Sequence, residues 1–295
     1  MLDELYPAIE AANHALSTVY LPALDAAALR NELSRPEAFL LMAVPTFSPE
    51  PVSEELLSVR NPYNAPGVYE SKLLNLCSKG MLETPGERSY QLTRKGLDAV
   101  KSLLLSLYRS LAGFHPLAEP NLEELARRLK DLADSCINSA VPPAKWSLEH
   151  IRKLDPGEDA HPMVKIDQHL SELSAYRDDA HLAAWQGLSV SGHTWELLTI
   201  LWVEKAASLE GLNKKLEHRG HALEQTRASL GELTALDWVV SSSDEVWQIT
   251  AQGRTIRAAA EDRTDRLFQA AFSEFSDYEL SETIELLKHF RHAIP

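Results

Sequence analysis

Cysteine is scarce in this chain, which has Cys77 and Cys136 among its 295 residues. Their spacing is not that of metal ligands, and two cysteines cannot build a disulfide framework. No stretch reaches 18 uninterrupted apolar residues, and the first segment, MLDELYPAIEAANHAL, has acidic residues but no basic start. These absences argue against a membrane span and a signal peptide. We therefore expect a cytoplasmic protein with no membrane partner.

Enzyme motifs are missing as well. The sequence contains no Gly-rich phosphate loop, no nucleophile elbow and no paired metal-binding motif. Among the histidines, His181 lies in the tightest group with Asp178 and Asp179, and Asp178 and His181 can share a helix face. Two ligands do not complete a metal site. We expect no catalytic residue, no metal and no cofactor.

Basic residues are outnumbered by acidic ones. Lys and Arg total 29 against 43 Asp and Glu, which gives a formal net charge of −14. Proteins that bind nucleic acid usually carry a basic excess. A duplex nevertheless responds to a local basic face within a screening length of about 8 Å at physiological salt. The placement of the charges therefore matters more than their sum.

The pattern that is present is mainly helical. A chain of 295 residues is long enough for two ordinary domains. Residues 141–161 concentrate Pro, Gly and charge, so we interpret them as a linker between a first domain, 1–140, and a second domain, 162–295. The first helix is expected to end near a break at YLPALD. A hairpin is expected at 81–92, with Pro85-Gly86 as its turn.

Two short segments of the chain carry the same pattern. GMLETPGERSYQLTRKG at 80–96 and LDWVVSSSDEVWQIT at 236–250 align without a gap at an offset of 157 residues. The same offset also matches residues on either side of these segments. The matched pairs are Leu73 and Leu230, Leu76 and Leu233, Met81 and Trp238, Tyr90 and Trp247, and Gly96 and Gly253. A shared order of helix, hairpin, Thr-x-x-Gly and helix predicts an internal duplication.

The order of three helices, a two-stranded hairpin and a long helix is typical of a winged helix-turn-helix domain. The second half also resembles the multiple-antibiotic-resistance regulator (MarR) family over most of residues 162–292. The matching motifs are Ser208-x-x-x-Leu212, Leu230-x-x-Leu233, Trp238-Val239, Ile249-Thr250-x-x-Gly253, and Leu280-Ser281-Glu282 ahead of Leu286-Leu287.

That family forms homodimers in which each chain supplies one winged helix. The resemblance therefore implies a mainly α fold with small β wings, in which tandem winged helix-turn-helix units form an intramolecular pseudo-dimer and the chain acts as a monomer. It also implies a DNA-binding transcriptional regulator whose partner is double-stranded DNA, read by a helix in the major groove.

The resemblance places candidate DNA contacts in both copies. In the second copy they are Lys214, Lys215, Arg219, His221, Gln225, Thr226 and Arg227; in the first they are Asn64, Tyr69, Lys72 and Arg88. The family wing commonly carries an arginine, whereas the second wing here reads Ser-Ser-Ser-Asp-Glu over 241–245. Carboxylates near phosphates are repelled, so this wing is poorly suited to hold DNA.

Two different recognition helices predict a site that is not palindromic, because a fused pair is released from two-fold symmetry. Small aromatic ligands often lodge between the terminal helices and the winged helix in the family. By that resemblance His14, Tyr20 and Trp195 are candidates for a small-molecule effector pocket. The alternative function is a regulator-derived scaffold that binds a small aromatic ligand or a partner protein and has lost DNA binding.

Overall fold

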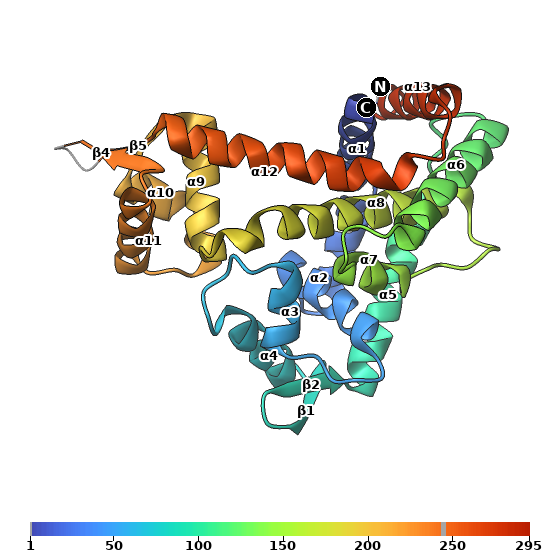
Figure 1. Ribbon diagram of the computed structural model, residues 1–295. Helices are drawn as coiled ribbons and strands as arrows, with labels where there is room; N and C mark the ends of the chain where they lie inside the picture. The colour runs from blue at the N-terminus through green and yellow to red at the C-terminus, as the bar shows by residue number, and fades with distance from the viewer. Residues whose placement is uncertain (1, 243–245) are drawn as a thin grey trace. The chain divides into compact units, whose positions relative to one another are not determined.

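The computed structural model describes residues 2–242 and 246–295 and is mainly helical, with two small antiparallel sheets (Figure 1). The expected mixture of helices and small β wings is therefore confirmed. The helices are α1 (Leu2–Arg30), α2 (Arg35–Ala43), α3 (Glu54–Arg60), α4 (Val68–Ser78), α5 (Arg94–Ala112), α6 (Glu119–Asn138), α7 (Trp146–Arg152), α8 (Pro162–Trp185), α9 (Gly192–Glu204), α10 (Leu209–Lys215), α11 (Leu223–Ala235), α12 (Ala251–Gln269) and α13 (Asp277–His292). None of the described helices is long and apolar enough to cross a membrane.

The chain forms two compact units. Unit 1 comprises Met1–Val52, Leu73–Ala180 and Arg266–Pro295, and unit 2 comprises Ser53–Lys72 and His181–Asp265. These limits differ from the segments 1–140 and 162–295, which stay a prediction from sequence. Unit 2 takes in α3 and the loop that leads into α4, although both lie early in the chain.

The core of unit 1 is helical. Leucines of α1, α5 and α6 pack with the first part of α8, the end of α12 and α13. Helix α1 was expected to stop near Pro22, but it continues to Arg30. Proline removes one hydrogen bond from a helix interior. Leu24, Ala27 and Ala28 lie beyond Pro22 and are buried, and their burial stabilises the added turns.

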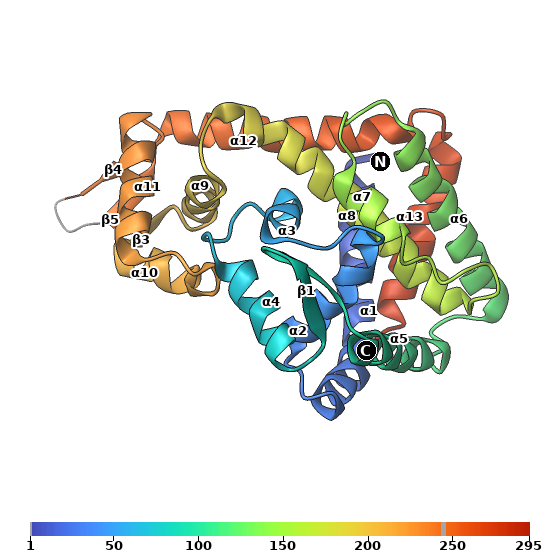
Figure 2. The same cartoon turned by 90° about the horizontal axis from the view of Figure 1, so that it is seen from below.

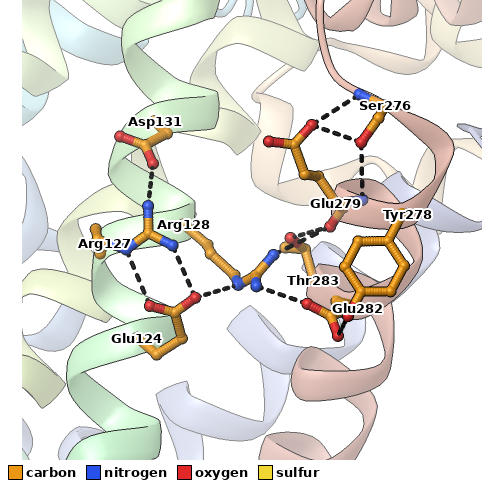
Figure 3. A network of polar contacts seen from close by, with 9 residues as sticks. All are labelled: Glu124, Arg127, Arg128, Asp131, Ser276, Tyr278, Glu279, Glu282 and Thr283. Carbon is orange, nitrogen blue, oxygen red and sulfur yellow. Dashed lines mark hydrogen bonds and ion pairs between the residues drawn. The ribbon is translucent and has the colours of Figure 1, made fainter.

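A polar network joins α6 to α13 within unit 1 (Figure 3). Arg128 is central to it: Nε donates to Glu124 at 2.6 Å, and Nη2 donates to Glu282 at 2.8 Å. Arg127 holds the pKa of Glu124 down at about 2, with a smaller effect from Arg128. Ser276 caps the start of α13 in a capping box. This network fixes the pairing of two helices that are far apart in sequence.

The first hairpin lies in unit 1 and consists of β1 (Leu82–Gly86) and β2 (Ser89–Leu92). Pro85-Gly86 was expected to be its turn, but Pro85 and Gly86 belong to β1, and the turn is formed by Glu87 and Arg88. Arg88 takes up the positive φ of 52° that this tight turn requires. Gly86 pairs with Ser89 after a register irregularity between Glu83 and Gly86, so the turn lies two residues later than expected.

Unit 2 contains three strands in the order β3-β5-β4, all antiparallel (Figure 2). They are β3 (Ala206–Ser208), β4 (Val239–Ser241) and β5 (Val246–Ile249). Trp247 of β5 and Trp238, which directly precedes β4, are buried in one core with leucines of α9, α10 and α11. Trp185 and Trp195 stack in the same core with ring centroids 5.5 Å apart. The acidic residues Asp244 and Glu245 of the second wing lie outside the described residues.

The long helix after each hairpin begins in the same way. Helices α5 and α12 each have 19 residues, and each is capped by a threonine hydroxyl that accepts a hydrogen bond from a glycine N–H at 3.0 Å. The cap pairs are Thr93 with Gly96 and Thr250 with Gly253. A Cβ on Gly96 would lie 2.0 Å from the Met81 carbonyl oxygen, and one on Gly253 would lie 2.1 Å from that of Trp238. Both glycines are required by close approach of the backbone.

Candidate nucleic-acid interface

Helices α10 and α11 form a helix-turn-helix within unit 2. Ser208 caps α10 by accepting a hydrogen bond from Gly211 N–H at 3.1 Å. The turn ends at Gly220, whose φ of 76° lies in the left-handed region. Leu212 and Leu230 are fully buried where the two helices pack, and β4 and β5 follow as the wing. This is the arrangement in which the second helix enters the major groove of duplex DNA.

Helix α11 presents part of the predicted contact set to solvent. Arg227 is exposed, and so is Gln225, although its side-chain oxygen caps the helix by accepting from Ala222 N–H at 2.8 Å. Thr226 differs from the prediction because it is fully buried. Its hydroxyl lies 3.0 Å from the Asn213 side-chain oxygen and cannot also reach a base. Its predicted role as a DNA contact is therefore not compatible with this packing.

The lysines of α10 lie near the turn and are exposed. Lys214 and Lys215 are the last two residues of the helix. Lys215 forms an ion pair with Glu204, the last residue of α9. An exposed ion pair contributes little to stability, so Lys215 can exchange its partner for a phosphate at small cost. Both lysines remain candidates for phosphate contacts.

Arg219, in contrast, is held inside unit 2. Its side chain is 17% exposed, and Glu196 of α9 binds it through Nη2 at 2.6 Å and through Nε. Nη1 donates to Asn61 at 3.1 Å and to Asn64 at 3.4 Å. The guanidinium also lies over the ring of Tyr63, 5.2 Å from its centroid. Arg219, which was predicted to contact a DNA phosphate, is thus already bound by partners within unit 2.

His221 is held in the same way. Its Nε2 donates to the Tyr63 carbonyl oxygen at 2.9 Å, and its ring stacks on His193 with centroids 3.7 Å apart. His193 is 3% exposed, and its Nε2 lies 3.1 Å from the hydroxyl of Thr226. Burial, together with the charges of His221 and Arg219, lowers the pKa of His193 to about 4. The imidazole of His193 is therefore neutral at physiological pH.

The loop between α3 and α4 supplies the partners of Arg219 and His221 that do not lie on α9, which are Asn61, Tyr63 and Asn64. Ala65 N–H donates to the Arg219 carbonyl oxygen at 2.8 Å. A Cβ on Gly192, the first residue of α9, would lie 2.3 Å from the Pro62 carbonyl oxygen, so the loop rests directly on the start of that helix (Figure 1). The side chain of Val68 approaches Gly220 closely.

The first-copy candidates fall into two groups. Asn64 and Tyr69 join the cluster around Arg219: Tyr69 bonds to Asn61 and Asn64, and burial raises the pKa of Tyr69. Lys72 Nζ lies 5.7 Å from the centroid of the Tyr69 ring. Arg88 is exposed in the hairpin turn of unit 1 and does not belong to this cluster. The structure therefore brings Asn64 and Tyr69, predicted for the first copy, into one cluster with Arg219, predicted for the second.

The comparison with known families agrees with this geometry. A model described as a helix-turn-helix family matches residues 98–295, which is more than half of the chain. The chain belongs to this helix-turn-helix family. The match includes α10, α11 and the second wing, whereas the first hairpin precedes it. Neither the search of curated proteins nor the search of solved structures found a match.

The three residues predicted to line an effector pocket are divided between the two units. His14 and Tyr20 of α1 line a pocket of about 340 Å³ in unit 1. Its other lining residues are Tyr6, Glu10, Asn13, Ser17 and Ser174. Burial, with a contribution from Asp167, raises the pKa of Tyr20, so its hydroxyl stays protonated. Trp195 instead belongs to the core of unit 2, where it is 1% exposed.

One cluster among the described residues has the chemistry of metal ligands. His115, Glu119 and His161 have potential ligand atoms within 4.8 Å of one another. His161 Nδ1 already accepts a hydrogen bond from Met163 N–H at 3.2 Å at the start of α8. Asp179, which lies beside His181 in the sequence, accepts hydrogen bonds from the backbone N–H groups of Ser147 and Leu148 at the start of α7.

Glu196 and His193 belong to the site but are not identifiable from sequence. Glu196 neutralises Arg219, and His193 supports both His221 and Thr226. Both residues lie on α9. The sequence of this helix does not indicate that His193 and Glu196 bind polar groups of α11 and of the turn before it. The glycine at 192, required by the close approach of the Pro62 backbone, is the one local signal of this contact.

Proposed function

We propose that the protein is a DNA-binding transcriptional regulator in which α11 reads the major groove. The observation that carries the proposal is the helix-turn-helix of α10 and α11, with Arg227 and Lys214 exposed on it and a three-stranded wing beside it. Membership of a helix-turn-helix family supports DNA binding in general. The proposal gives the chain no catalytic role and no cofactor, and it places the protein in the cytoplasm.

The proposal includes an internal duplication of a MarR-like winged helix-turn-helix. It is supported by the two hairpins and by the threonine-capped helices α5 and α12, whose first residues, Arg94 and Ala251, are 157 positions apart. In the DNA-bound form one chain acts as a pseudo-dimer, with α4 and α11 as unequal recognition helices. Their target is a duplex that lacks two-fold symmetry. A small-molecule effector would bind beside His14 and Tyr20.

Fluorescence anisotropy with genomic duplex fragments at two salt concentrations tests the function. Binding that weakens as salt rises is expected, because phosphate contacts release counterions. Flat curves at low salt, where even non-specific contacts should register, would exclude the DNA-binding function.

Arg227→Ala is expected to cost about 1–3 kcal/mol of binding and to relax base preference at one position, because an exposed arginine in the first half of α11 can read a guanine edge. Lys214→Gln is the matched control. It should weaken all sequences evenly and lower the salt slope by about one. Anisotropy across a set of single-base variants of the preferred fragment measures both. Equal losses on every sequence for Arg227→Ala would assign this residue to phosphate instead.

A scaffold that no longer binds DNA is the second candidate. The binding of Arg219 and His221 by partners within unit 2 favours it, as does the net charge of −14. A partner protein or small aromatic ligand would then be the natural target. The flat anisotropy curves described above would decide for this scaffold.

A further inference from the structure

The turn before α11 and the loop before α4, its counterpart in the proposed first copy, contact each other within unit 2. At the repeat offset, Arg219 corresponds to residue 219 − 157 = 62, which is Pro62, and His221 corresponds to Asn64. At this offset residues 61–65 of the loop at 61–67 correspond to residues 218–222 of the turn at 216–222, so the two segments overlap as counterparts of the two proposed copies. Ala65 N–H bonds to Arg219, and the carbonyl oxygen of Tyr63 accepts from His221.

This contact does not fit two recognition helices reading one duplex. Successive major-groove half-sites are about 34 Å apart, so paired recognition helices must be separated by about that distance. Here the starts of α4 and α11 meet, because Val68 Cγ2 would lie 2.6 Å from a Cβ on Gly220. The first helical turn of α4 and the loop that precedes α11 therefore cover each other. In a complex with DNA, each of these two surfaces would face the DNA backbone.

We propose that this arrangement is a closed, self-inhibited state in which the two turns mask each other from DNA. We call the contacts that hold it the turn latch, made by Arg219 with Glu196, Asn61, Asn64 and Tyr63. The inference rests on the proposed DNA-binding function and adds its regulation. The DNA-competent state is one in which the loop at 61–67 has left the turn at 216–222.

The turn latch has two effects on DNA affinity. It neutralises Arg219, a predicted phosphate contact, because the Glu196 carboxylate accepts hydrogen bonds from both Nε and Nη2 of the guanidinium. It also hides backbone groups of both turns, since Ala65 N–H and the Arg219 carbonyl are bonded to each other. If the open state is a minor fraction, the apparent dissociation constant rises in inverse proportion to that fraction. Weakening the turn latch must then tighten DNA binding.

The double variant Asn61→Ala/Asn64→Ala tests this without changing the net charge. It removes the two side-chain oxygens that accept from Arg219 Nη1. We expect a tightening of about 10-fold on a fluorescein-labelled 40-bp genomic duplex at low salt, which corresponds to about 1.4 kcal/mol. A direct DNA contact by Asn64, as expected from sequence, requires the opposite: weaker binding. Asn121→Ala, an exposed asparagine of α6, is the matched control and should change nothing.

Hydrogen exchange at the Ala65 amide reports the closed state independently of DNA. This amide is protected by the Arg219 carbonyl oxygen, so its exchange should accelerate about 10-fold in the double variant and when the 40-bp duplex is added. Fast exchange at Ala65 in the unmodified protein would show that the turns do not stay together, and would overturn the inference.

A reversible cross-link provides the converse test. The Ala65 Cβ lies 3.9 Å from an ideal Cβ on Gly220, a separation suited to a disulfide. The variant Ala65→Cys/Gly220→Cys includes Val68→Ala to relieve the close contact at Gly220, and Cys77→Ser to remove a partly exposed thiol. A cysteine at the φ of 76° of residue 220 is strained in both redox states, so the reduced form of the same variant is the control. We expect the oxidised form to bind the duplex at least about 10-fold more weakly than the reduced form, with recovery on adding dithiothreitol.

The outcomes separate the inference from the function on which it rests. Equal DNA affinity of the oxidised and reduced forms would overturn self-inhibition while leaving DNA binding intact. Absence of binding by the unmodified protein, by the double variant and by the reduced form would reject the DNA-binding function, and with it any gating of DNA. In that case protection of the Ala65 amide would still show whether the turns pair.

Discussion

Gly253→Ala is expected to lower the free energy of unfolding of unit 2 by about 3 kcal/mol, at the upper end of the range for overpacking. The added methyl carbon would lie 2.1 Å from the Trp238 carbonyl oxygen and 2.9 Å from a side-chain carbon of Ile249. Backbone must move to relieve the first contact. That carbonyl also accepts from Thr250 N–H at 3.0 Å, so the movement weakens the junction of β4 with α12. Thermal and urea unfolding followed by tryptophan fluorescence measure the loss.

Gly96→Ala is the equivalent change in unit 1, where the added carbon would lie 2.0 Å from the Met81 carbonyl oxygen. It should destabilise unit 1 by a similar amount. Gly231→Ala is the control, because no atom lies within 4 Å of its ideal Cβ and the position is an exposed interior residue of α11. It should stabilise the helix by up to about 1 kcal/mol. A loss at Gly231 comparable to that at Gly253 would contradict the backbone-contact explanation.

These glycines also show what local sequence can reveal. The Thr-x-x-Gly pattern predicted where two long helices begin, because a threonine cap and a glycine against a carbonyl are local requirements. Apolar alternation predicted both hairpins for the same reason. The turn of the first hairpin was misplaced because Pro85 can occupy an exposed edge of β1, and because the turn at Glu87 and Arg88 places a non-glycine residue, Arg88, at a positive φ.

The candidate site was less accessible to sequence because its contacts are long-range. Arg219 looked like a phosphate ligand from its neighbours in sequence, yet its partners are Glu196 on α9 and Asn61, which lies 158 residues away. Nothing in the local charge pattern identifies such partners. Thr226 was placed on the exposed face of α11 because it lies between Gln225 and Arg227, but its hydroxyl satisfies a buried polar cluster.

The helix α1 error has a similar origin. Pro22 signals a break when the helix is considered alone, since it removes a backbone donor. Burial of Leu24 and Ala27 outweighs that local cost. Tertiary packing therefore decided the length of the helix, and only local propensity was available from sequence. The same packing brings His14 and Tyr20 to one pocket while placing Trp195 in the other unit.

His193 should make unit 2 lose about 3 kcal/mol of stability as the pH falls from about 6.5 to 4. Burial and the neighbouring cations lower its pKa to about 4 in the folded protein, against an ordinary 6.5. Between these values the unfolded state binds more protons than the folded state, so stability rises with pH across the window and is complete above it. Each unit of pKa difference corresponds to about 1.4 kcal/mol.

The comparison that isolates this effect is His193→Gln against the unmodified protein at each pH. Asp167 in unit 1 acts with the opposite sign: burial raises its pKa to about 7, so its carboxyl group favours the folded state as pH falls toward 4. Subtracting the two unfolding curves removes this contribution. The difference should shrink by about 3 kcal/mol from pH 7 to pH 4, whereas the difference between the unmodified protein and Asn121→Ala, a change at an exposed residue that does not titrate, should not vary with pH. Because protonated His193 would face His221, which donates to Tyr63, the Ala65 amide should lose protection over the same pH range. A pH-independent difference would mean that His193 is already hydrated and that its ring does not support the turn latch.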